Sequence, residues 1–245
     1  SLHLMKEWPM NTQVEQPRRG PSLILLHSIP IFAGVPDSQL EQIAKVAFHR
    51  RVPRQTTIVR AGDSTDSLYV LISGGAKVLK SDEEGREVIL TLLGPGEFFG
   101  EMGLIDGSPR SADVMATETC ELLVITKADF KRCLAENFDL CLNIMKSLVQ
   151  RLREADRNIE SLALMDVYGR VAKLLIDFSE EERGQRVIRR RVTKQDIAKM
   201  IGASREMVSR VMKDLENRGY FRVEEGRIVI LEKRVPAAPA PAPRP

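Results

Sequence analysis

The strongest constraint on the fold is a long run in which apolar residues recur every three or four positions. Within 145–162 these are Met145, Leu148, Leu152, Ala155, Ile159 and Leu162, and most residues between them are charged or polar. This heptad pattern predicts a helix with one narrow apolar seam, which another helix has to cover. We therefore predict a long helix over 138–165 that forms a coiled-coil homodimer. The alternative is a helix that packs on its own domain.

A different pattern precedes this helix. Between 56 and 126, short β-branched runs are separated by Gly, Asp and Ser, and SDEEG at 81–85 connects two of them. Such runs are typical of an antiparallel β-domain with hairpin turns. The stretch 36–51 opens with Pro-Asp-Ser and carries apolar residues at helical spacing, which predicts a short helix before the sheet.

The region after the long helix has a helical pattern with marked helix starts. Asp166, Thr193 and Ser204 stand where N-cap residues belong, and Gly202 lies in a short turn between two amphipathic segments. SEEERGQ, before these two segments, is interpreted as a loop, and YFRVEEGRIVIL, after them, as two short strands. The Pro/Ala-rich end of the chain cannot bury a core and is expected to be disordered.

Composition excludes several classes of protein. The 245 residues contain three cysteines without C-x-x-C spacing and three histidines, which argues against a disulfide framework and against a metal site. No apolar run is long enough to cross a membrane, and the N-terminus lacks the features of a secretory signal. We expect a cytoplasmic protein of one large domain or two modest ones.

The positive charge is concentrated near the C-terminus. The chain has a net charge of +3, but residues 186–227 hold twelve Lys or Arg against six Asp or Glu. The rest of the chain is therefore mildly acidic. A basic segment on an acidic body predicts a polyanionic partner for that segment.

The segment FFGEMGLIDGSPRSADV (98–114) has the composition of an anion-binding site. Gly100 and Gly103 flank Glu101, and their backbone amides can approach an anion closely. Arg110 offers a charge-assisted donor and Ser111 a hydroxyl, while Glu101 can accept from a ribose hydroxyl. Taken alone, the segment is equally compatible with a β-turn that carries a surface salt bridge.

The two segments within 193–219 combine an apolar face with a polar one. The apolar positions suit either a small helical domain or a helix-turn-helix, but the opposite face carries Arg205, Glu206, Ser209 and Arg210. Arginine can bind guanine O6 and N7, and glutamate can accept from cytosine N4, so this face suits a DNA major groove. Thr193, Lys194 and Gln195 can contact phosphate at the start of the preceding helix.

In this order the two motifs resemble those of the cyclic-AMP receptor protein/FNR (Crp/Fnr) family of bacterial transcription regulators, over residues 29–233. The resemblance implies an α+β fold with an N-terminal cyclic-nucleotide-binding β-roll of the double-stranded jelly-roll type, a long dimerisation helix and a C-terminal winged helix-turn-helix. The expected division is an N-terminal tail (1–28), a nucleotide-binding domain (29–137), the dimerisation helix (138–165), the DNA-binding domain (166–235) and a disordered tail (236–245).

The resemblance also assigns site residues. Glu101 is expected to hold the ribose 2′-hydroxyl, and Arg110 and Ser111 the cyclic phosphate, which Arg151 approaches. The full ligand-binding set is Gly100, Glu101, Met102, Gly103, Arg110, Ser111, Ala112, Arg151 and Asp156. The full DNA-binding set is Thr193, Lys194, Gln195, Ser204, Arg205, Glu206, Ser209 and Arg210, of which Arg205, Glu206 and Arg210 match base-contacting positions.

Two departures from the cyclic-AMP receptor protein affect the choice of ligand. That protein has a threonine and a serine near the adenine, where this chain has Ala155 and Asp156. Asp156 can accept from adenine N6 or from guanine donors, or it can be a solvated residue beside the seam. Cyclic AMP is the favoured ligand; cyclic di-GMP and activity without a ligand are the alternatives. The chain has neither the N-terminal cysteine cluster of the FNR branch nor the histidines of a haem sensor.

The expected partners are double-stranded DNA with palindromic TGTGA-like half-sites, a second copy of the chain, and RNA polymerase. No membrane partner and no metal are expected. The sequence carries no catalytic motif, so we do not expect an enzyme. Two other classes remain as alternatives, a cyclic-nucleotide-binding regulatory subunit of an enzyme and a DNA-architectural protein with a vestigial pocket.

Overall fold

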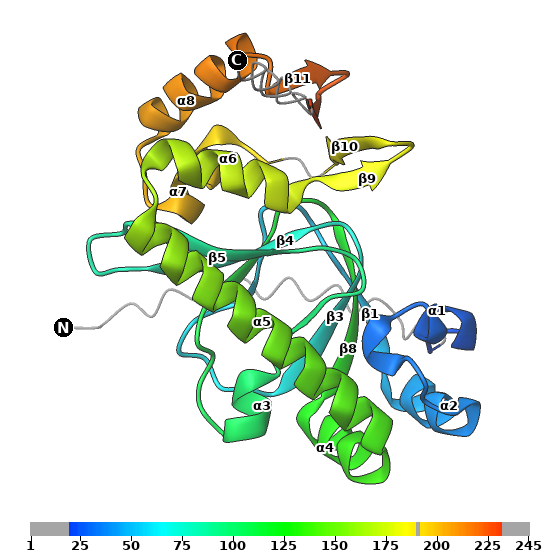
Figure 1. Cartoon of the computed structure of the whole chain (residues 1–245). Helices are drawn as coiled ribbons and strands as arrows, with labels where there is room; N and C mark the ends of the chain where they lie inside the picture. The colour runs from blue at the N-terminus through cyan, green and yellow to red at the C-terminus, as the bar shows by residue number, and fades with distance from the viewer. Residues whose placement is uncertain (1–19, 190–191, 232–245) are drawn as a thin grey trace, which may run out of the picture. The chain divides into compact units, whose positions relative to one another are not determined.

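A computed structural model describes residues 20–189 and 192–231, which divide into two compact units (Figure 1). The first unit comprises residues up to 78 together with 92–147, and the second comprises 79–91 and the chain from 148 onward. Most of the expected N-terminal tail, all of the C-terminal tail and Arg190 and Arg191 lie outside the described residues. In the described part of the N-terminal tail, Leu23–His27 forms a short helix, α1.

Two further short helices precede the sheets of the first unit. They are η1 (Pro30–Phe32) and α2 (Asp37–Val46). The prediction of a helix over 36–51 is wrong at its end, because Ala47 is extended and Phe48–Val52 forms strand β1. β1 pairs with Cys120–Val124 of a later strand. This pairing overrides the helical spacing of the apolar residues, since it satisfies the backbone of β1 in a sheet.

The first unit is built on two four-stranded sheets that enclose an apolar core, and the antiparallel β-domain predicted from the sequence is confirmed. The strand orders are β1-β8-β3-β6 and β2-β7-β4-β5. The core includes Tyr69, Leu71 and Phe99 from one sheet and Ile58 and Val114 from the other. Besides β1 the strands are β2 (Thr57–Val59), β3 (Ser67–Ser73), β4 (Ala76–Ser81), β5 (Glu87–Leu93), β6 (Phe98–Phe99), β7 (Asp113–Ala116) and β8 (Cys120–Thr126). The ends of β4 and β5 nearest their shared turn belong to the second unit.

Besides α1 and η1, two helices of the first unit were not predicted. α3 (Met102–Asp106) is a single short helix inside the glycine-rich segment, and α4 (Lys127–Glu136) follows β8 directly. The N-terminus of α4 is capped by Thr126, whose hydroxyl accepts from the amide of Asp129 at 3.3 Å.

The long predicted helix is present as α5 (Phe138–Leu164). Its seam is open to solvent along much of its length, since Leu152 is 63% exposed and Ile159 is 65% exposed. Leucine and isoleucine side chains at this spacing are stabilised by burial against another helix. In the described part of the chain, no helix combines the length and the apolar character needed to cross a membrane.

The second unit contains three more helices and a small sheet. α6 (Val167–Phe178) starts at Asp166, whose carboxylate accepts from the amide of Gly169 at 2.8 Å. α7 (Lys194–Ile201) and α8 (Arg205–Asn217) are joined by a turn in which Gly202 adopts a left-handed conformation with φ +63°. Their apolar faces meet in a core with α6 that includes Val171, Ile197 and Val208.

The sheet of the second unit has the strand order β11-β12-β10-β9. β11 (Phe221–Glu224) and β12 (Arg227–Ile230) form the hairpin predicted from the sequence. The prediction of a loop over SEEERGQ is wrong, because Glu180–Glu182 forms β9 and pairs with β10 (Gln185–Ile188). Glutamate is poorly represented in strands, so this pairing was not apparent from composition.

Candidate nucleotide-binding and DNA-binding sites

The glycine-rich segment folds as a tight connection between β6 and β7. Gly100 has φ +87°, and a Cβ at this residue would lie 2.3 Å from Arg110 Nη1 and 3.0 Å from the Ser67 carbonyl oxygen. A Cβ on Gly103 would lie 2.2 Å from the Ser108 carbonyl oxygen. Both glycines are therefore required by close packing, and Gly100 also by its backbone conformation.

Arg110 is the buried centre of this segment, and its side chain is 5% exposed. Nη1 donates to the Gly100 carbonyl at 2.8 Å, and Nη2 donates to the Ser67 carbonyl at 2.8 Å and to Asp66 Oδ1 at 3.2 Å. The guanidinium also lies 5.7 Å from the centroid of the Tyr69 ring. A guanidinium has five N–H donors. Described residues use three of them, which leaves two for an anion.

The other residues of the segment lie around this arginine. Glu101 is 2% exposed, and its carbonyl accepts from the amides of Leu104 and Ile105, both at 3.0 Å. Ser111 is exposed, with Oγ 3.8 Å from Met102 Sδ, and Ala112 is buried. The fold thus brings together Gly100, Glu101, Met102, Gly103, Arg110, Ser111 and Ala112 in the first unit.

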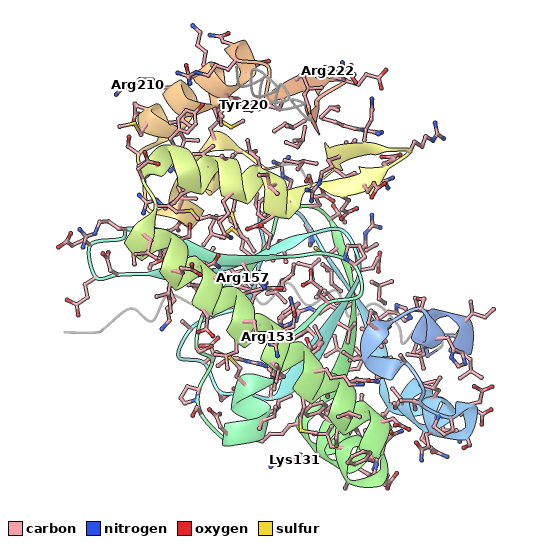
Figure 2. All side chains as sticks on the ribbon, viewed as in Figure 1. Lys131, Arg153, Arg157, Arg210, Tyr220 and Arg222 are labelled. Atoms are coloured by element: carbon pink, nitrogen blue, oxygen red, sulfur yellow. The ribbon has the colours of Figure 1, made fainter. Side chains whose placement is uncertain are left out.

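The remaining predicted ligand-binding residues lie on α5 in the second unit. Arg151 is half-buried, whereas Ala155 and Asp156 are exposed. Figure 2 shows that Arg153 and Arg157 belong to the same stretch of α5. Because Asp156 is exposed in the single chain, its carboxylate remains hydrated and is available to a ligand or to solvent.

The sequence analysis missed the residues that hold Arg110. Asp66 and Ser67 lie at the start of β3, more than forty positions before the arginine. The only signal was an aspartate in a turn next to a strand, which is common in β-domains. Thr65 was missed for the same reason; its hydroxyl donates to the Ser108 carbonyl at 3.0 Å and fixes the loop between α3 and Arg110.

The helix starts of the DNA-binding region are well capped. Thr193 and Asp196 form a reciprocal capping box, in which Thr193 Oγ1 accepts from the Asp196 amide at 3.0 Å. Ser204 Oγ accepts from the Met207 amide at 3.1 Å. Since both hydroxyls cap their own helices, the groups that α7 offers outward are the exposed side chains of Lys194 and Gln195.

The outer face of α8 carries charges without local partners. Arg205, Glu206 and Arg210 are exposed and form no ion pair with any residue in the described ranges, whereas Ser209 is partly buried. Figure 2 marks Arg210 on α8. Val208, Val211, Met212 and Leu215 are buried on the opposite face. The arrangement leaves a cationic and an anionic hydrogen-bonding group free to contact base edges.

The far end of α8 is fixed to α6. Arg218 Nε lies 2.9 Å from Asp214 Oδ2, and its guanidinium lies 6.0 Å from the Tyr168 ring centroid. Asp214 raises the pKa of Arg218, and burial, followed by Asp214, raises the pKa of Tyr168. This charged contact at the end of α8 contrasts with Arg205 and Arg210, which form no ion pair with the described residues.

Comparison with known proteins agrees with this geometry. The cyclic nucleotide-binding domain family matches residues 49–137, and the Crp-like helix-turn-helix domain family matches residues 169–234. The chain is 34% identical over 205 residues to the cAMP-activated global transcriptional regulator CRP of Pasteurella multocida, covering 81% of this chain and 97% of that protein. It is 34% identical over 209 residues to the cAMP-activated global transcriptional regulator Vfr of Pseudomonas aeruginosa, covering 80% and 96%.

A solved structure is similar over the same length. It is the c-di-GMP responsive global regulator CLP of Xanthomonas campestris, at 29% identity and a TM-score of 0.67, covering 81% of this chain and 100% of that one. The relatives are transcription regulators rather than enzymes. With a cyclic-nucleotide-binding domain, a long helix and a helix-turn-helix in this order, the chain belongs to the Crp/Fnr family of DNA-binding, cyclic-nucleotide-responsive transcription regulators.

Proposed function

We propose that the protein is a homodimeric regulator, switched by cyclic AMP, that binds a palindromic DNA site with TGTGA-like half-sites. The observation that carries this proposal is the buried guanidinium of Arg110, three of whose five donors are used by described residues, in a chain whose Arg205, Glu206 and Arg210 form no ion pair with described residues. One site suits a small anion, and the other suits a DNA groove. The working units are 29–137 for the nucleotide, 138–165 for the dimer and 166–235 for DNA.

The chemistry of the glycine-rich segment 98–114, called the cassette from here on, suits a cyclic ribose phosphate. The two remaining N–H donors of Arg110 and the exposed hydroxyl of Ser111 are assigned to the phosphate oxygens. Glu101 is assigned to the ribose 2′-hydroxyl, with backbone from Gly100, Met102, Gly103 and Ala112. Arg151 and Asp156 of α5 complete the set, and Asp156 faces the base. Cyclic AMP is favoured because the curated relatives are cAMP-activated.

Cyclic di-GMP is the second candidate ligand. The specific observation in its favour is the exposed Asp156, since a carboxylate can accept from the guanine N1 and N2 donors. A structural relative, CLP, is described as c-di-GMP responsive. Activity without a ligand is the third possibility, and a titration separates all three.

The dimer is assigned to α5. The seam residues Leu152 and Ile159 are mostly exposed, and a second copy of the same helix can cover them.

A two-fold dimer places two α8 helices on half-sites about one helical turn apart. Within each half-site, Arg205, Glu206 and Arg210 contact bases. The DNA phosphates are contacted by Thr193, Lys194 and Gln195, and the DNA-binding surface also includes Ser204 and Ser209. A regulator bound in this way acts in the cytoplasm, with RNA polymerase as its partner.

The switch is assigned to the junction between α5 and α6. α5 ends at Leu164 and α6 begins at Val167, so residues 164–166 form a short hinge. A ligand can shift this hinge only through its different affinities for the two states. The other class of function, a regulatory subunit of an enzyme, does not account for the free arginines of α8.

The first prediction tests the switch. Cyclic AMP is expected to tighten binding to a TGTGA-containing palindrome by about tenfold or more, because couplings of 1–3 kcal/mol are typical. Gel-shift titrations with cyclic AMP, cyclic GMP, cyclic di-GMP and no ligand measure it, and calorimetry gives the affinity of each nucleotide. Equal DNA affinity with and without cyclic AMP would contradict the proposal.

The second prediction tests the cassette. Gly100→Ala should weaken cyclic AMP binding by about tenfold or more, because its Cβ would displace the Arg110 guanidinium. Gly107→Ala is the matched control: Gly107 also has a positive φ, of 79°, but a Cβ there meets nothing within 4 Å. Calorimetric titration of both variants decides, and an equal loss in both would show that backbone strain alone is responsible.

The third prediction concerns sequence preference. Glu206→Ala should reduce discrimination at one base pair of the half-site by about tenfold, because it removes one acceptor for a base. Lys194→Ala should weaken binding to all sequences alike and lower the salt dependence by about one ion. Binding to a set of single-base variants of the site, at two salt concentrations, separates the two effects. Unchanged preference in Glu206→Ala would remove that residue from the assigned set.

The fourth prediction concerns the dimer. Leu152→Glu should convert the protein largely to monomer at micromolar concentration, because it places a charge in the apolar seam. Arg153→Glu, on the neighbouring exposed position, should leave the dimer intact. Light scattering after size-exclusion chromatography measures both masses. A dimer that persists in Leu152→Glu would place the interface elsewhere.

A further inference from the structure

The turn between β4 and β5 is rigidly built. Asp82 Oδ1 accepts from the amides of Glu84 and Arg86 at 3.0 and 2.8 Å, and Asp82 Oδ2 accepts from Arg86 Nε at 2.6 Å. The side-chain hydrogen bond from Arg86 is the main reason why the pKa of Asp82 is lowered. Gly85, with φ +76°, completes the turn. Arg86 forms its ion pairs with Asp82 and Glu84, so it does not neutralise the next residue, Glu87.

Glu87 forms an ion pair with Lys199 of α7, and both residues belong to the second unit. The two side chains are 32% and 25% exposed, so their charges are less screened than those of a surface pair. Around them lies a cleft lined from the hairpin by residues 85–88 and from α7 and its following turn by Gln195, Ala198, Lys199, Gly202 and Ala203. The hairpin tip and α7 thus face each other across this cleft, and the Glu87–Lys199 ion pair joins them.

This pair differs from the other ion pairs of the second unit. The partners in the other pairs are at most seven positions apart in sequence: Arg86–Asp82, Arg86–Glu84, Lys173–Asp177, Arg189–Glu182, Arg218–Asp214 and Arg222–Glu224. Glu87 and Lys199 are 112 positions apart. Among the described residues of the second unit, it is the ion pair that ties the hairpin to the helix-turn-helix.

The ion pair is connected on the hairpin side to the cassette and on the other side to α8. β7 begins directly after Arg110, Ser111 and Ala112, and β7 neighbours β4 in the order β2-β7-β4-β5. β5 begins at Glu87. On the other side, Ile197 and Ile201 of α7 pack with Val208 of α8, so a displacement of α7 moves the helix that carries Arg205. Hydrogen-bonded strands and packed helices therefore connect the cassette to α8 through this pair.

We propose that the Glu87–Lys199 ion pair is a latch that couples the β4–β5 hairpin to the helix-turn-helix and carries part of the response to the nucleotide. The proposal rests on the proposed function for its ligand dependence, but the latch itself is a property of the chain. It provides a route from the cassette that does not run along α5. Without the pair, the hairpin can move without displacing α7.

The test compares DNA affinity with and without cyclic AMP. Glu87→Gln and Lys199→Gln should each reduce the ratio of the two affinities by about threefold or more, and the exchanged double variant, Glu87→Lys with Lys199→Glu, should recover most of it. Glu83→Gln is the matched control, because it removes the same charge from an exposed position of the same turn. An unchanged or larger ratio in the single variants, or an equal reduction in Glu83→Gln, would overturn the proposal.

A second measurement separates the latch from the proposed function. In nucleotide-free protein, Lys199→Gln should raise amide hydrogen exchange at 82–88, because the hairpin tip loses its contact with α7. Lys194→Gln, on the same helix but outside the cleft, should not. Unchanged exchange in Lys199→Gln overturns the latch. If wild-type protein shows no response to any nucleotide but Lys199→Gln raises this exchange, then the switch is wrong and the contact stands.

Discussion

The cost of burying the Arg110 guanidinium governs the architecture of the first unit. A buried cation is costly unless it is hydrogen-bonded, and here the carbonyls of Gly100 and Ser67 and the carboxylate of Asp66 accept three of its five donors. This requirement holds the start of β3 against the end of β6 and excludes a side chain at residue 100. The same packing leaves two donors unused by described residues, so an anion that binds there would meet a guanidinium that is already ordered.

The two sites use arginine in opposite ways. Arg110 is immobilised by neighbours, as suits a small ligand whose phosphate has a fixed shape. Arg205 and Arg210 are exposed and unpaired with described residues, as suits long side chains that adapt to base edges. The helix that carries them is rigid all the same, because its start is capped by Ser204 and its end is fixed by Asp214 and Arg218.

The sequence predicted the elements that follow from local pattern and missed those that follow from pairing. The period of the apolar residues was enough for α5, α7 and α8, and turn residues were enough for the β11–β12 hairpin. β1 and β9 were missed, because each is a strand only through a partner that the pattern does not show. For the site, the motif identified Arg110 and its neighbours in sequence, whereas Asp66 and Ser67 depend on a contact across more than forty positions.

A regulator of this kind has to connect a rigid cassette to a helix that presents its side chains to DNA. α5 supplies one connection, since its end at Leu164 meets the Asp166 cap of α6 through a short hinge. A hinge alone leaves the orientation of the next domain weakly defined, because few contacts constrain it. The proposed Glu87–Lys199 latch is a second connection, between the β4–β5 hairpin and the helix-turn-helix. In such a mechanism, the free energy that a nucleotide can contribute is the difference between its binding free energies for the two states.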